Sequence, residues 1–505
     1  MSLLAVDMGT SSCKAVAFSE HGRVIAQKSC FYSPAQSPQP SWAEMPADSL
    51  WQGLTTVCRA VSAQTRKDPV EALSISSHGE TFVPVDSRCR PVAPAIFNFD
   101  NRAVAEAKWL AETLGPRKLF DITGLAVHPM YPAAKILWIR KHLPKVFASA
   151  IRFLAVPDYL LCRLGLPAFI DYSLASRFFF FDIRQRAWST EILSACHLSL
   201  DQLPLPAPTG SIAGELSVSA AKNLGLKQGT VVVVGGHDQP CASLGSGALH
   251  SGRISASLGT YECLAAASDA PALNDRAFAA SLNSYCHVIP DQYVTLAYFP
   301  SGIMLDWFLR LVGSKNDLAN QTSINKLCAT LEADTSPAPS GLCITPHLPG
   351  TCNPDFNPEA TGVIAGVRPA TSRADLYKGI LEGIACEFAL MTELLQQATG
   401  AFPDVYVSGG GLRSPLGLKL RAALAGCELH LLQCREAVCL GTAILAGVAV
   451  GKYQSFESAV EQVVRVAETI HPEPSMRHLY AAQMSQYILL YSSLAPLRQA
   501  QAACH

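Results

Sequence analysis

Apolar and polar positions alternate in short runs at the start of the chain. Residues 3–9 (LLAVDMG) and 13–19 (CKAVAFS) are two apolar runs joined by a turn, and residues 23–29 (RVIAQKS) follow after the turn residues EHG. Runs of this length, bounded by glycine and small polar residues, are typical of strands. The pattern therefore predicts a three-stranded meander, with further strands at 70–77 and 82–86.

Apolar residues at helical spacing separate these strands. The spacing predicts helices at 48–66, 102–114 and 134–149. In contrast, the Pro- and Ser-rich residues 33–47 and the Pro- and Gly-rich residues 201–214 predict irregular connections. Strands interleaved with helices indicate an α/β fold.

A second half of similar design is predicted to begin near residue 250. Residues 253–259 (RISASLG) and 261–268 (YECLAAAS) are again two strands joined by a Gly-Thr turn, as at residues 3–19. This repeat indicates a diverged duplication rather than a tandem array. The other elements predicted here are a strand at 404–410 and helices at 303–312, 373–399, 415–425 and 437–450.

Length and composition narrow the class of protein. A chain of 505 residues is too long for one hydrophobic core. We expect a domain at 1–248, a second at 249–455 and a helical tail at 456–505 packed on the second domain. The net charge of −1 argues against a nucleic-acid or anionic-membrane surface, which needs a basic excess.

The 17 cysteines are scattered without a CxxC pair, so the spacing does not indicate a zinc site. We expect buried free thiols in a reducing cytoplasm. The sequence has no run of about eighteen uncharged apolar residues, so no membrane span is predicted. The chain reaches Asp7 without a basic region, so no signal peptide is predicted and a cytoplasmic location is expected.

A phosphate-binding turn is predicted at residues 7–14 (DMGTSSCK), since the chain has no Walker P-loop and no GxGxxG after a strand. Gly9 permits a turn, three hydroxyl residues and their N–H groups follow, and Lys14 adds a positive charge; such a nest suits phosphate oxygens. Asp7 at the strand end is suited to hold Mg²⁺ through water. The alternative is an ordinary hairpin with a capping aspartate.

Two further glycine turns suit a nucleotide. Residues 257–262 (SLGTYE) carry the same Gly-Thr turn as the first half, and two such turns predict facing phosphate loops. Residues 407–415 (VSGGGLRSP) lead from a strand through three glycines to a helix capped by Ser414, and this flat backbone suits adenine and ribose. The alternative is a tight strand-to-helix turn.

A carboxylate ends the most apolar strand of the chain. Residues 231–245 (VVVVGGHDQPCASLG) run from four valines into Asp238. Gly235 and Gly236 let a ligand approach, and in phosphoryl transfer one carboxylate orients and deprotonates the attacking hydroxyl. The alternative is a helix N-cap, because Pro240 suits the first turn of a helix.

With these pieces in this order, the chain resembles the FGGY family of carbohydrate kinases, within the actin-like ATPase superfamily, from about residue 3 to about residue 450. DMGTSSCK is similar to the family's first phosphate motif and SLGTYE to its second. SGGGLRS with REAVCLGTAILAG (435–447) resembles its adenosine motif, and GGHDQPCASLG its catalytic segment. The resemblance implies two RNase H-like domains that close over an interdomain cleft, with Asp238 as the general base.

The resemblance also implies roles for individual residues, with ATP and Mg²⁺ as cofactors. On the nucleotide side it implies Thr10, Ser11, Ser12, Lys14, Gly259, Thr260, Gly302, Gly410, Gly411 and Ser414. On the acceptor side it implies Glu80, Thr81, Asp100, Arg102, Tyr131, Asp238 and Gln239. For the metal it implies Asp7 and Asp238.

Some positions depart from the family pattern. The acceptor motif 77–82 (SHGETF) differs from the Gln-Met-His-Gly of xylulokinases. It also differs from the Gln-Arg-Glu-Thr of glycerol kinases, because this chain has Gly79 in place of the arginine. Asn98 replaces a tryptophan, and Lys419 and Ala423 replace a glutamine and an aspartate. Glu80 as a solvated turn residue and Arg102 as a first-turn helix charge are alternatives to sugar contacts.

The expected function is ATP-dependent phosphorylation of a primary hydroxyl of a ketose, with D-xylulose first. Alternative acceptors are glycerol, gluconate, L-ribulose and a deoxyketose. Two other classes remain open, a catalytically silent sugar-binding regulator and an actin- or chaperone-like ATPase acting on proteins. Expected partners are a small sugar or polyol and a second copy in a homodimer, with no nucleic acid and no membrane.

Overall fold

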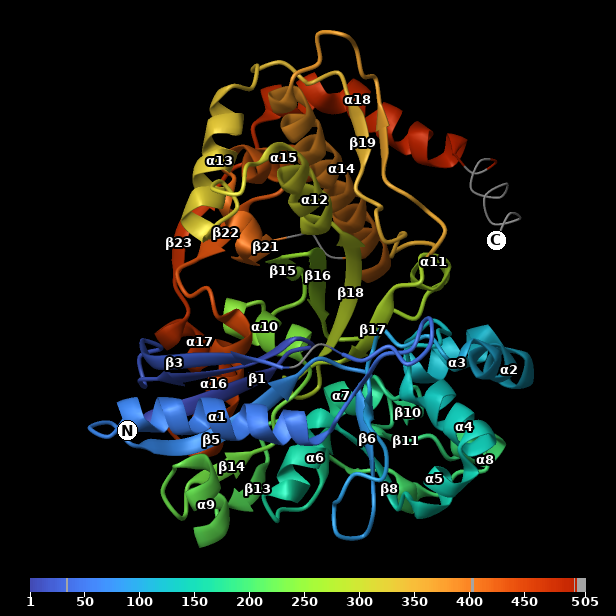
Figure 1. The fold of residues 1–505 in the computed structure, drawn as a ribbon, viewed down its shortest axis with the longest axis vertical. Coiled ribbons are helices and arrows are strands. Elements are labelled where there is room, and N and C mark those ends of the chain that lie inside the picture. The colour runs from blue at the N-terminus through green and yellow to red at the C-terminus, as the bar shows by residue number, and fades with distance from the viewer. Residues whose placement is uncertain (33–34, 401–403, 495, 497–505) are drawn as a thin grey trace.

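The computed structural model describes residues 1–32, 35–400, 404–494 and 496. Residues 33–34 of the predicted loop, and residues 495 and 497–505 of the predicted tail, lie outside the described part. Two large sheets, each covered by helices, follow one another along the long axis of the molecule (Figure 1).

The first sheet has six strands in the order β13-β14-β5-β1-β2-β3. Its strands are β1 (Ser2–Met8), β2 (Ser12–Phe18), β3 (Val24–Phe31), β5 (Val70–Ser77), β13 (Ile212–Glu215) and β14 (Val231–Val233). β1, β2 and β3 form the predicted meander. β1 and β5 are parallel, so Asp7 pairs with Ser76 and the carboxyl ends of both strands meet at one edge.

The second sheet has seven strands in the order β17-β18-β16-β15-β21-β22-β23. They are β15 (Arg253–Leu258), β16 (Tyr261–Ser268), β17 (Asn283–Cys286), β18 (Tyr293–Pro300), β21 (Asp404–Gly409), β22 (Leu429–Leu432) and β23 (Val466–Ile470). From β18 to β23 this sheet repeats the order and strand polarity of the first from β3 to β13. The topology agrees with the predicted duplication.

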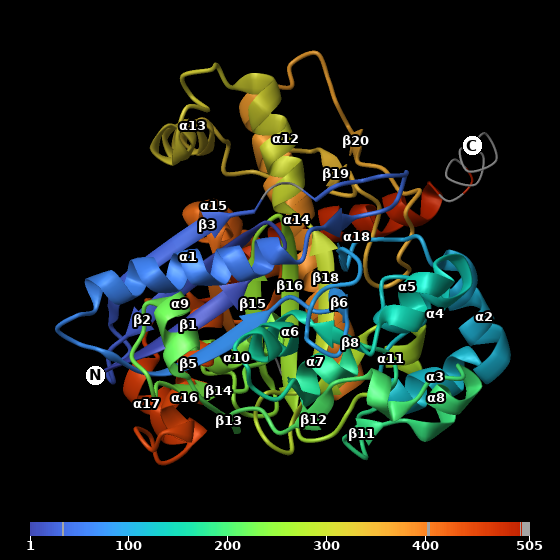
Figure 2. The ribbon, with the colours of Figure 1, turned by 60° about the horizontal axis from the view of Figure 1, so that its bottom comes forward.

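Helices cover both sheets. α1 (Asp48–Gln64) packs its apolar face on β2 and β3, as Figure 2 shows, and α14 (Arg373–Thr399) covers the second sheet with α15 (Pro415–Ala425) and α18 (Pro474–Ser493). α16 (Ala437–Ala449) lies between β22 and β23 in the chain, yet it packs with α10 (Asp238–Ser246) against β1 and β5 of the first sheet (Figure 1). The chain therefore interleaves its two halves.

The predicted tail at 456–505 is not purely helical. It contains β23, which forms an edge of the second sheet, and α17 (Phe456–Val463), whose Ala459 and Val463 join the core beneath the first sheet. α18 packs on the second half as expected, against α14 and α15. The prediction assigned β23 and α17 to a single helical tail. It missed the strand because the residues before α18 are mostly polar and do not show a strand pattern.

A smaller region inserted into the first half flanks the acceptor motif. Its four-stranded sheet contains β4 (Glu44–Met45), β6 (Phe82–Val85), β7 (Ala95–Ile96) and β8 (Arg152–Ala155), and its helices include α2 (Val104–Leu114), α3 (Pro116–Thr123), α6 (Val156–Arg163), α7 (Tyr172–Ser176) and α8 (Thr190–Ala195). The helix predicted at 134–149 is two helices, α4 (Pro132–His142) and α5 (Pro144–Ser149), because Pro144 starts a new helix. Two strands, β12 (Leu205–Ala207) and β13, lie in the predicted irregular connection at 201–214.

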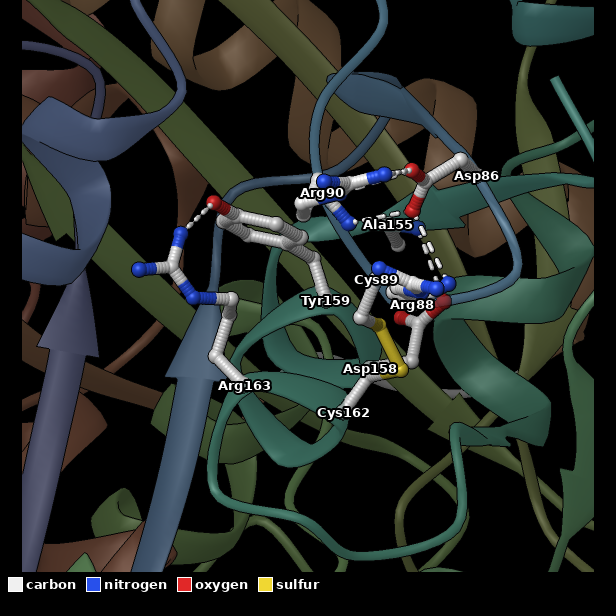
Figure 3. The surroundings of a disulfide bond; sticks show 9 residues. All are labelled: Asp86, Arg88, Cys89, Arg90, Ala155, Asp158, Tyr159, Cys162 and Arg163. Carbon is white, nitrogen blue, oxygen red and sulfur yellow. Dashed lines mark hydrogen bonds and ion pairs between the residues drawn. A yellow bond between two sulfur atoms is a disulfide. The ribbon is translucent and has the colours of Figure 1, made fainter. Parts of the chain in front are cut away.

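The expectation of free thiols throughout is wrong for one pair. Cys89 and Cys162 form a disulfide that joins the turn after β6 to α6 (Figure 3). The two residues are 73 positions apart, and sequence spacing alone does not reveal such a pair. The other fourteen cysteines within the described residues are free. A search of the described helices finds none with the length and apolar character needed to cross a bilayer.

Candidate functional site

Six residues predicted on the nucleotide side line a single cavity of about 320 Å³. They come from the β15–β16 turn, the start of α12 (Gly302–Val312) and the segment between β21 and α15. β15 and β21 are parallel neighbours with Leu258 opposite Gly409, so both glycine turns leave the same edge of the sheet. The cavity residues that the sequence predicted are Gly259, Thr260, Gly302, Gly410, Gly411 and Ser414.

The Gly259–Thr260 turn is fixed by the first turn of α12. Gly302 N donates to the carbonyl of Gly259 at 3.2 Å, and Ser301 N donates to the carbonyl of Thr260 at 3.1 Å. A Cβ atom at Gly302 would lie 2.5 Å from the Gly259 carbonyl oxygen, closer than side chains are found. Glycine is therefore required at position 302 for the turn to pack on the helix.

Buried charges that the sequence analysis did not single out hold the cavity walls. Glu262 and Arg421 form a buried ion pair, with Arg421 Nε 3.1 Å from Glu262 Oε2, and Ser301 Oγ donates to Glu262 Oε1 at 2.6 Å. Near this pair, Glu332 of α13 (Gln321–Ala333) accepts from Ser414 Oγ at 2.8 Å. Ser414 caps α15 as predicted, because its Oγ also accepts from the N–H of Gly417.

The first predicted phosphate turn lies between β1 and β2. Gly9 N donates to the Ser12 carbonyl at 2.9 Å, and this closes the turn with Thr10 and Ser11 exposed at its tip. Lys14 Nζ lies 2.7 Å from Glu436 Oε2, at the start of α16, so the lysine already has a carboxylate partner from the other half. A phosphate at this turn would share Lys14 with Glu436.

Asp238 is the first residue of α10, and His237, rather than Asp238, is the cap residue. His237 Nε2 lies 3.2 Å from Asp238 Oδ1, and its Nδ1 lies 2.7 Å from the hydroxyl oxygen of Tyr285 on β17. Burial, with Arg177 and His78 nearby, holds the pKa of His237 well below its usual range, so the ring is neutral. In a neutral ring one nitrogen donates and the other accepts, so the hydrogen bond between Nδ1 and the Tyr285 hydroxyl group helps to fix the tautomer.

The two aspartates predicted for the metal both resist ionisation. Burial, and then the charges of Asp7 and Glu80, raise the pKa of Asp238 to about 8. Burial and Glu436 raise the pKa of Asp7 to about 6, although Lys14 and a hydrogen bond from Ser76 oppose the rise. The Asp238 side chain remains 23% exposed, whereas Asp7 Oδ1 is buried and has no hydrogen-bond partner among the described residues.

These two carboxylates fit Mg²⁺. A cation between them would stabilise both charges and give the buried Asp7 oxygen a partner, directly or through water. In the described part of the chain, no group of three or more His, Cys, Asp or Glu side chains could hold a metal ion. Magnesium usually takes one or two carboxylates together with waters and substrate phosphates.

Glu80 is a buried acceptor-side residue, 5% exposed, and not a solvated turn residue. It forms an ion pair with Arg177, whose Nε lies 2.5 Å from Glu80 Oε1. The guanidinium of Arg177 lies 5.3 Å from the ring centre of Tyr131 and 4.9 Å from that of Tyr285. Glu80 and Tyr131 are therefore brought together as predicted, around an arginine that the sequence analysis did not identify.

Three other predicted acceptor residues are occupied by internal contacts. Asp100 is fully buried, and its carboxylate accepts from Ala43 N and from the Arg102 guanidinium. Arg102 also pairs with Glu44, so it is not a helix charge in solvent. Thr81 Oγ1 lies 2.7 Å from His78 Nε2 and accepts from Asn98 N. These side chains form the wall behind Glu80, and the structure does not present Asp100 or Arg102 to a ligand.

Gln239 follows Asp238 in the first turn of α10 and is half-buried. Its backbone N–H and its side chain act on the Asp238 carboxylate and favour the charged form, against the effect of burial. The structure therefore places Gln239 beside the predicted base, in the position that the sequence implied.

Comparison with known proteins places this geometry in a family. The FGGY family of carbohydrate kinases matches over residues 2–245 with its N-terminal domain and over 254–450 with its C-terminal domain. The chain is 29% identical to a xylulose kinase of Escherichia coli (strain K12) over 98% of this chain and 99% of that protein. It is 26% identical to a gluconokinase of Bacillus subtilis (strain 168) over 91% of this chain and 90% of that protein.

A solved structure agrees with the fold. A ligand-bound xylulose kinase from Lactobacillus acidophilus superimposes with a TM-score of 0.88 over 98% of each chain, at 21% identity. The predicted α/β architecture of two RNase H-like domains of the actin-like ATPase type is confirmed.

Proposed function

The chain belongs to the FGGY family of carbohydrate kinases, phosphotransferases with an alcohol group as acceptor, and from this premise we propose that it phosphorylates a neutral ketose, D-xylulose before others. The phosphate donor is ATP with Mg²⁺. The primary hydroxyl of the sugar attacks the γ-phosphate, with Asp238 as the base.

The environment of Asp238 is the observation that carries the proposal. A carboxyl group whose pKa is raised holds a proton more strongly than an ordinary aspartate, which suits it to receive the proton of an attacking hydroxyl. His237 Nε2 lies 3.2 Å from one oxygen of the Asp238 carboxyl group, and we infer that the other oxygen is available to the substrate. Asp7 and Asp238 would hold Mg²⁺, which neutralises charge on the phosphate oxygens when bound.

Positive charge is already paired on the acceptor side, and this favours a neutral substrate. Arg177 is paired with Glu80, and Arg102 with Asp100 and Glu44. Burial lowers the pKa of Lys135 to about 7, and its Nζ donates to the Phe97 carbonyl. A sugar acid would bring its carboxylate beside Glu80 and Asp238 without an unpaired arginine from these residues, at a cost in free energy.

Gluconate is the second candidate, because gluconokinases are among the relatives of similar identity. The test is ADP release by the purified protein with ketoses, polyols and aldonates. We expect D-xylulose to give the highest kcat/KM and gluconate to give at least about tenfold less. A preference for gluconate would contradict the neutral acceptor.

The base assignment has its own variant. Asp238→Asn is expected to lower kcat by about 10² to 10⁴-fold, the range of general-base catalysis, and to leave binding of Mg²⁺–ATP in place. The control is Asp201→Asn, which removes an exposed carboxylate from a surface turn. Near-normal turnover by Asp238→Asn would eliminate Asp238 as the base.

A further inference from the structure

Arg177 is held on several sides by elements far apart in the chain. It follows α7, is 3% exposed, and pairs through Nε with Glu80, which precedes β6. Tyr131, at the start of α4, and Tyr285, from β17 of the second sheet, place their rings against its guanidinium. The position of this cation is therefore fixed by both halves of the molecule.

One nitrogen of this guanidinium is unused. Arg177 Nη1 is buried and has no hydrogen-bond partner within the described residues. A buried donor without a partner costs about 1–3 kcal/mol, and more where the group is charged, so native proteins rarely keep one that nothing satisfies. Nη1 is enclosed, and the ring of Tyr285, from the second sheet, lies against the same guanidinium. The unpaired N–H points to an oxygen supplied by a ligand.

A missing side chain at Gly79 makes room for this arginine. A Cβ atom at Gly79 would lie 3.1 Å from Arg177 Cγ and 3.1 Å from His237 Nε2. Glycine thus lets the arginine stem pass beside the same imidazole nitrogen that contacts Asp238. Arg177 and the proposed base therefore both lie near His237.

The charge of the pair selects the kind of oxygen. Glu80 neutralises the guanidinium, so Nη1 offers a directed hydrogen bond without a net positive charge. Such a donor suits a carbonyl or hydroxyl oxygen better than a carboxylate or phosphate. Glu80 can in turn accept from a neighbouring hydroxyl, because a carboxylate has about four lone-pair sites.

On the basis of the proposed function, we propose that Arg177 is the acceptor-positioning residue. Its Nη1–H donates to one oxygen of the sugar, Glu80 accepts from an adjacent hydroxyl, and the reacting hydroxyl is thereby turned toward Asp238. The ligand of this subsite is a neutral ketose or polyol with adjacent oxygens. Arg177 acts by orienting the substrate and takes no part in proton transfer.

The first test is kinetic and uses whichever acceptor the wild-type protein phosphorylates. Removal of Arg177 alone leaves Glu80 buried and unpaired, so the informative variant is the neutral pair Arg177→Met with Glu80→Gln. We expect KM for the acceptor to rise about ten- to a hundredfold, as for loss of charge-assisted hydrogen bonds. KM for ATP stays unchanged. The control is Arg186→Met, which breaks a surface pair with Asp291.

The second test identifies the acceptor oxygen that Arg177 binds. Monodeoxy analogues of the acceptor are compared on the wild type and on Arg177→Lys. For the wild type, the analogue that lacks the oxygen bound by Arg177 should be a poorer substrate than the parent acceptor. For Arg177→Lys, loss of the same oxygen should cost little more. For the other analogues, the loss from the missing oxygen and the loss from the substitution should add. If no acceptor supports ADP release by the wild type, the proposed function itself fails. If the wild type is active and the neutral pair keeps its KM, or all deoxy losses add, only the Arg177 proposal is overturned.

Discussion

At the scale of single residues, the site depends on carboxylates that burial and mutual repulsion keep from ionising freely. Asp7 and Asp238 are both affected, whereas Glu80 is paired with Arg177. A cation is the simplest means of stabilising the two remaining charges together. A Mg²⁺ ion held by both carboxylates would be coupled to the proposed base, and the titration of Asp238 would then report on binding of the ion.

The acceptor kcat/KM should depend on pH through Asp238. The raised pKa favours the protonated carboxyl near neutral pH, so the fraction of active base grows as pH rises, reaches half near pH 8 and levels off above that. Mg²⁺ stabilises the carboxylate and should move the rise to lower pH. The measurement is kcat/KM from about pH 5.5 to about pH 9, at low and at saturating Mg²⁺.

The variant Asp7→Asn tests whether nearby negative charge raises the pKa of Asp238. It removes one of the negative charges that raise the pKa of Asp238, so the rise in kcat/KM at low Mg²⁺ should move to lower pH, even if overall activity falls. A profile that is flat in wild type, or that moves to higher pH in Asp7→Asn, would contradict this electrostatic account.

Residues of the candidate site could be predicted from the sequence where a short segment contained a recognisable motif. Asp238 follows a valine run with two glycines, and the Gly-Thr turn repeats, so short segments sufficed. Arg177 gave no such signal, because its partner Glu80 is 97 residues away and Tyr285 is on another sheet. Burial of Asp100 was equally hidden, since a charged residue in a loop reads as exposed until its partners are known.

At the scale of elements, periodicity identified most strands and helices of the two sheets. Periodicity did not identify every element correctly. β17 and β18 were not predicted, although β18 reads as an apolar run, and Pro144 divided one predicted helix. The crossing of α10 and α16 was also beyond prediction, because each glycine involved has its partner on a helix nearly two hundred residues away.

Gly441→Ala should destabilise the protein through that crossing. A Cβ atom at Gly441 would lie 1.9 Å from the Cys241 carbonyl oxygen, and one at Gly245 2.0 Å from that of Ala437. Both contacts are to backbone, so the helices must move apart. Overpacking should lower the free energy of unfolding by about 3 kcal/mol, and the higher helix propensity of alanine should return about 1 kcal/mol. The expected net loss of stability is therefore about 2 kcal/mol.

Denaturant unfolding measures this loss, with Ala449→Ser at the half-buried end of the same helix as control. The control should stay within about 0.5 kcal/mol of wild type. Equal midpoints for Gly441→Ala and wild type would show that the helices do not pack this closely.

At the scale of the whole molecule, the two halves share a core. The face of the first sheet that carries Leu3, Val16 and Phe18 is covered by Leu440 and Ile444 of α16, from the far end of the chain. The pair Lys14–Glu436 joins the same elements. We therefore propose that a boundary near residue 248 divides the chain by sequence and by sheet, but does not produce two units that fold alone.

A fragment of residues 1–248 tests this directly. Without α16, the apolar face of β1, β2 and β5 is exposed, which favours aggregation or a loosely packed state that binds a hydrophobic dye. We expect the fragment to lack cooperative thermal unfolding and near-ultraviolet dichroism. A second fragment, in which residues 433–465 are attached to 1–248 by a flexible linker, restores α16 and α17 to the shared core and should unfold cooperatively. If residues 1–248 alone unfold as sharply as the longer fragment, the first half is an independent domain and α16 is only its neighbour.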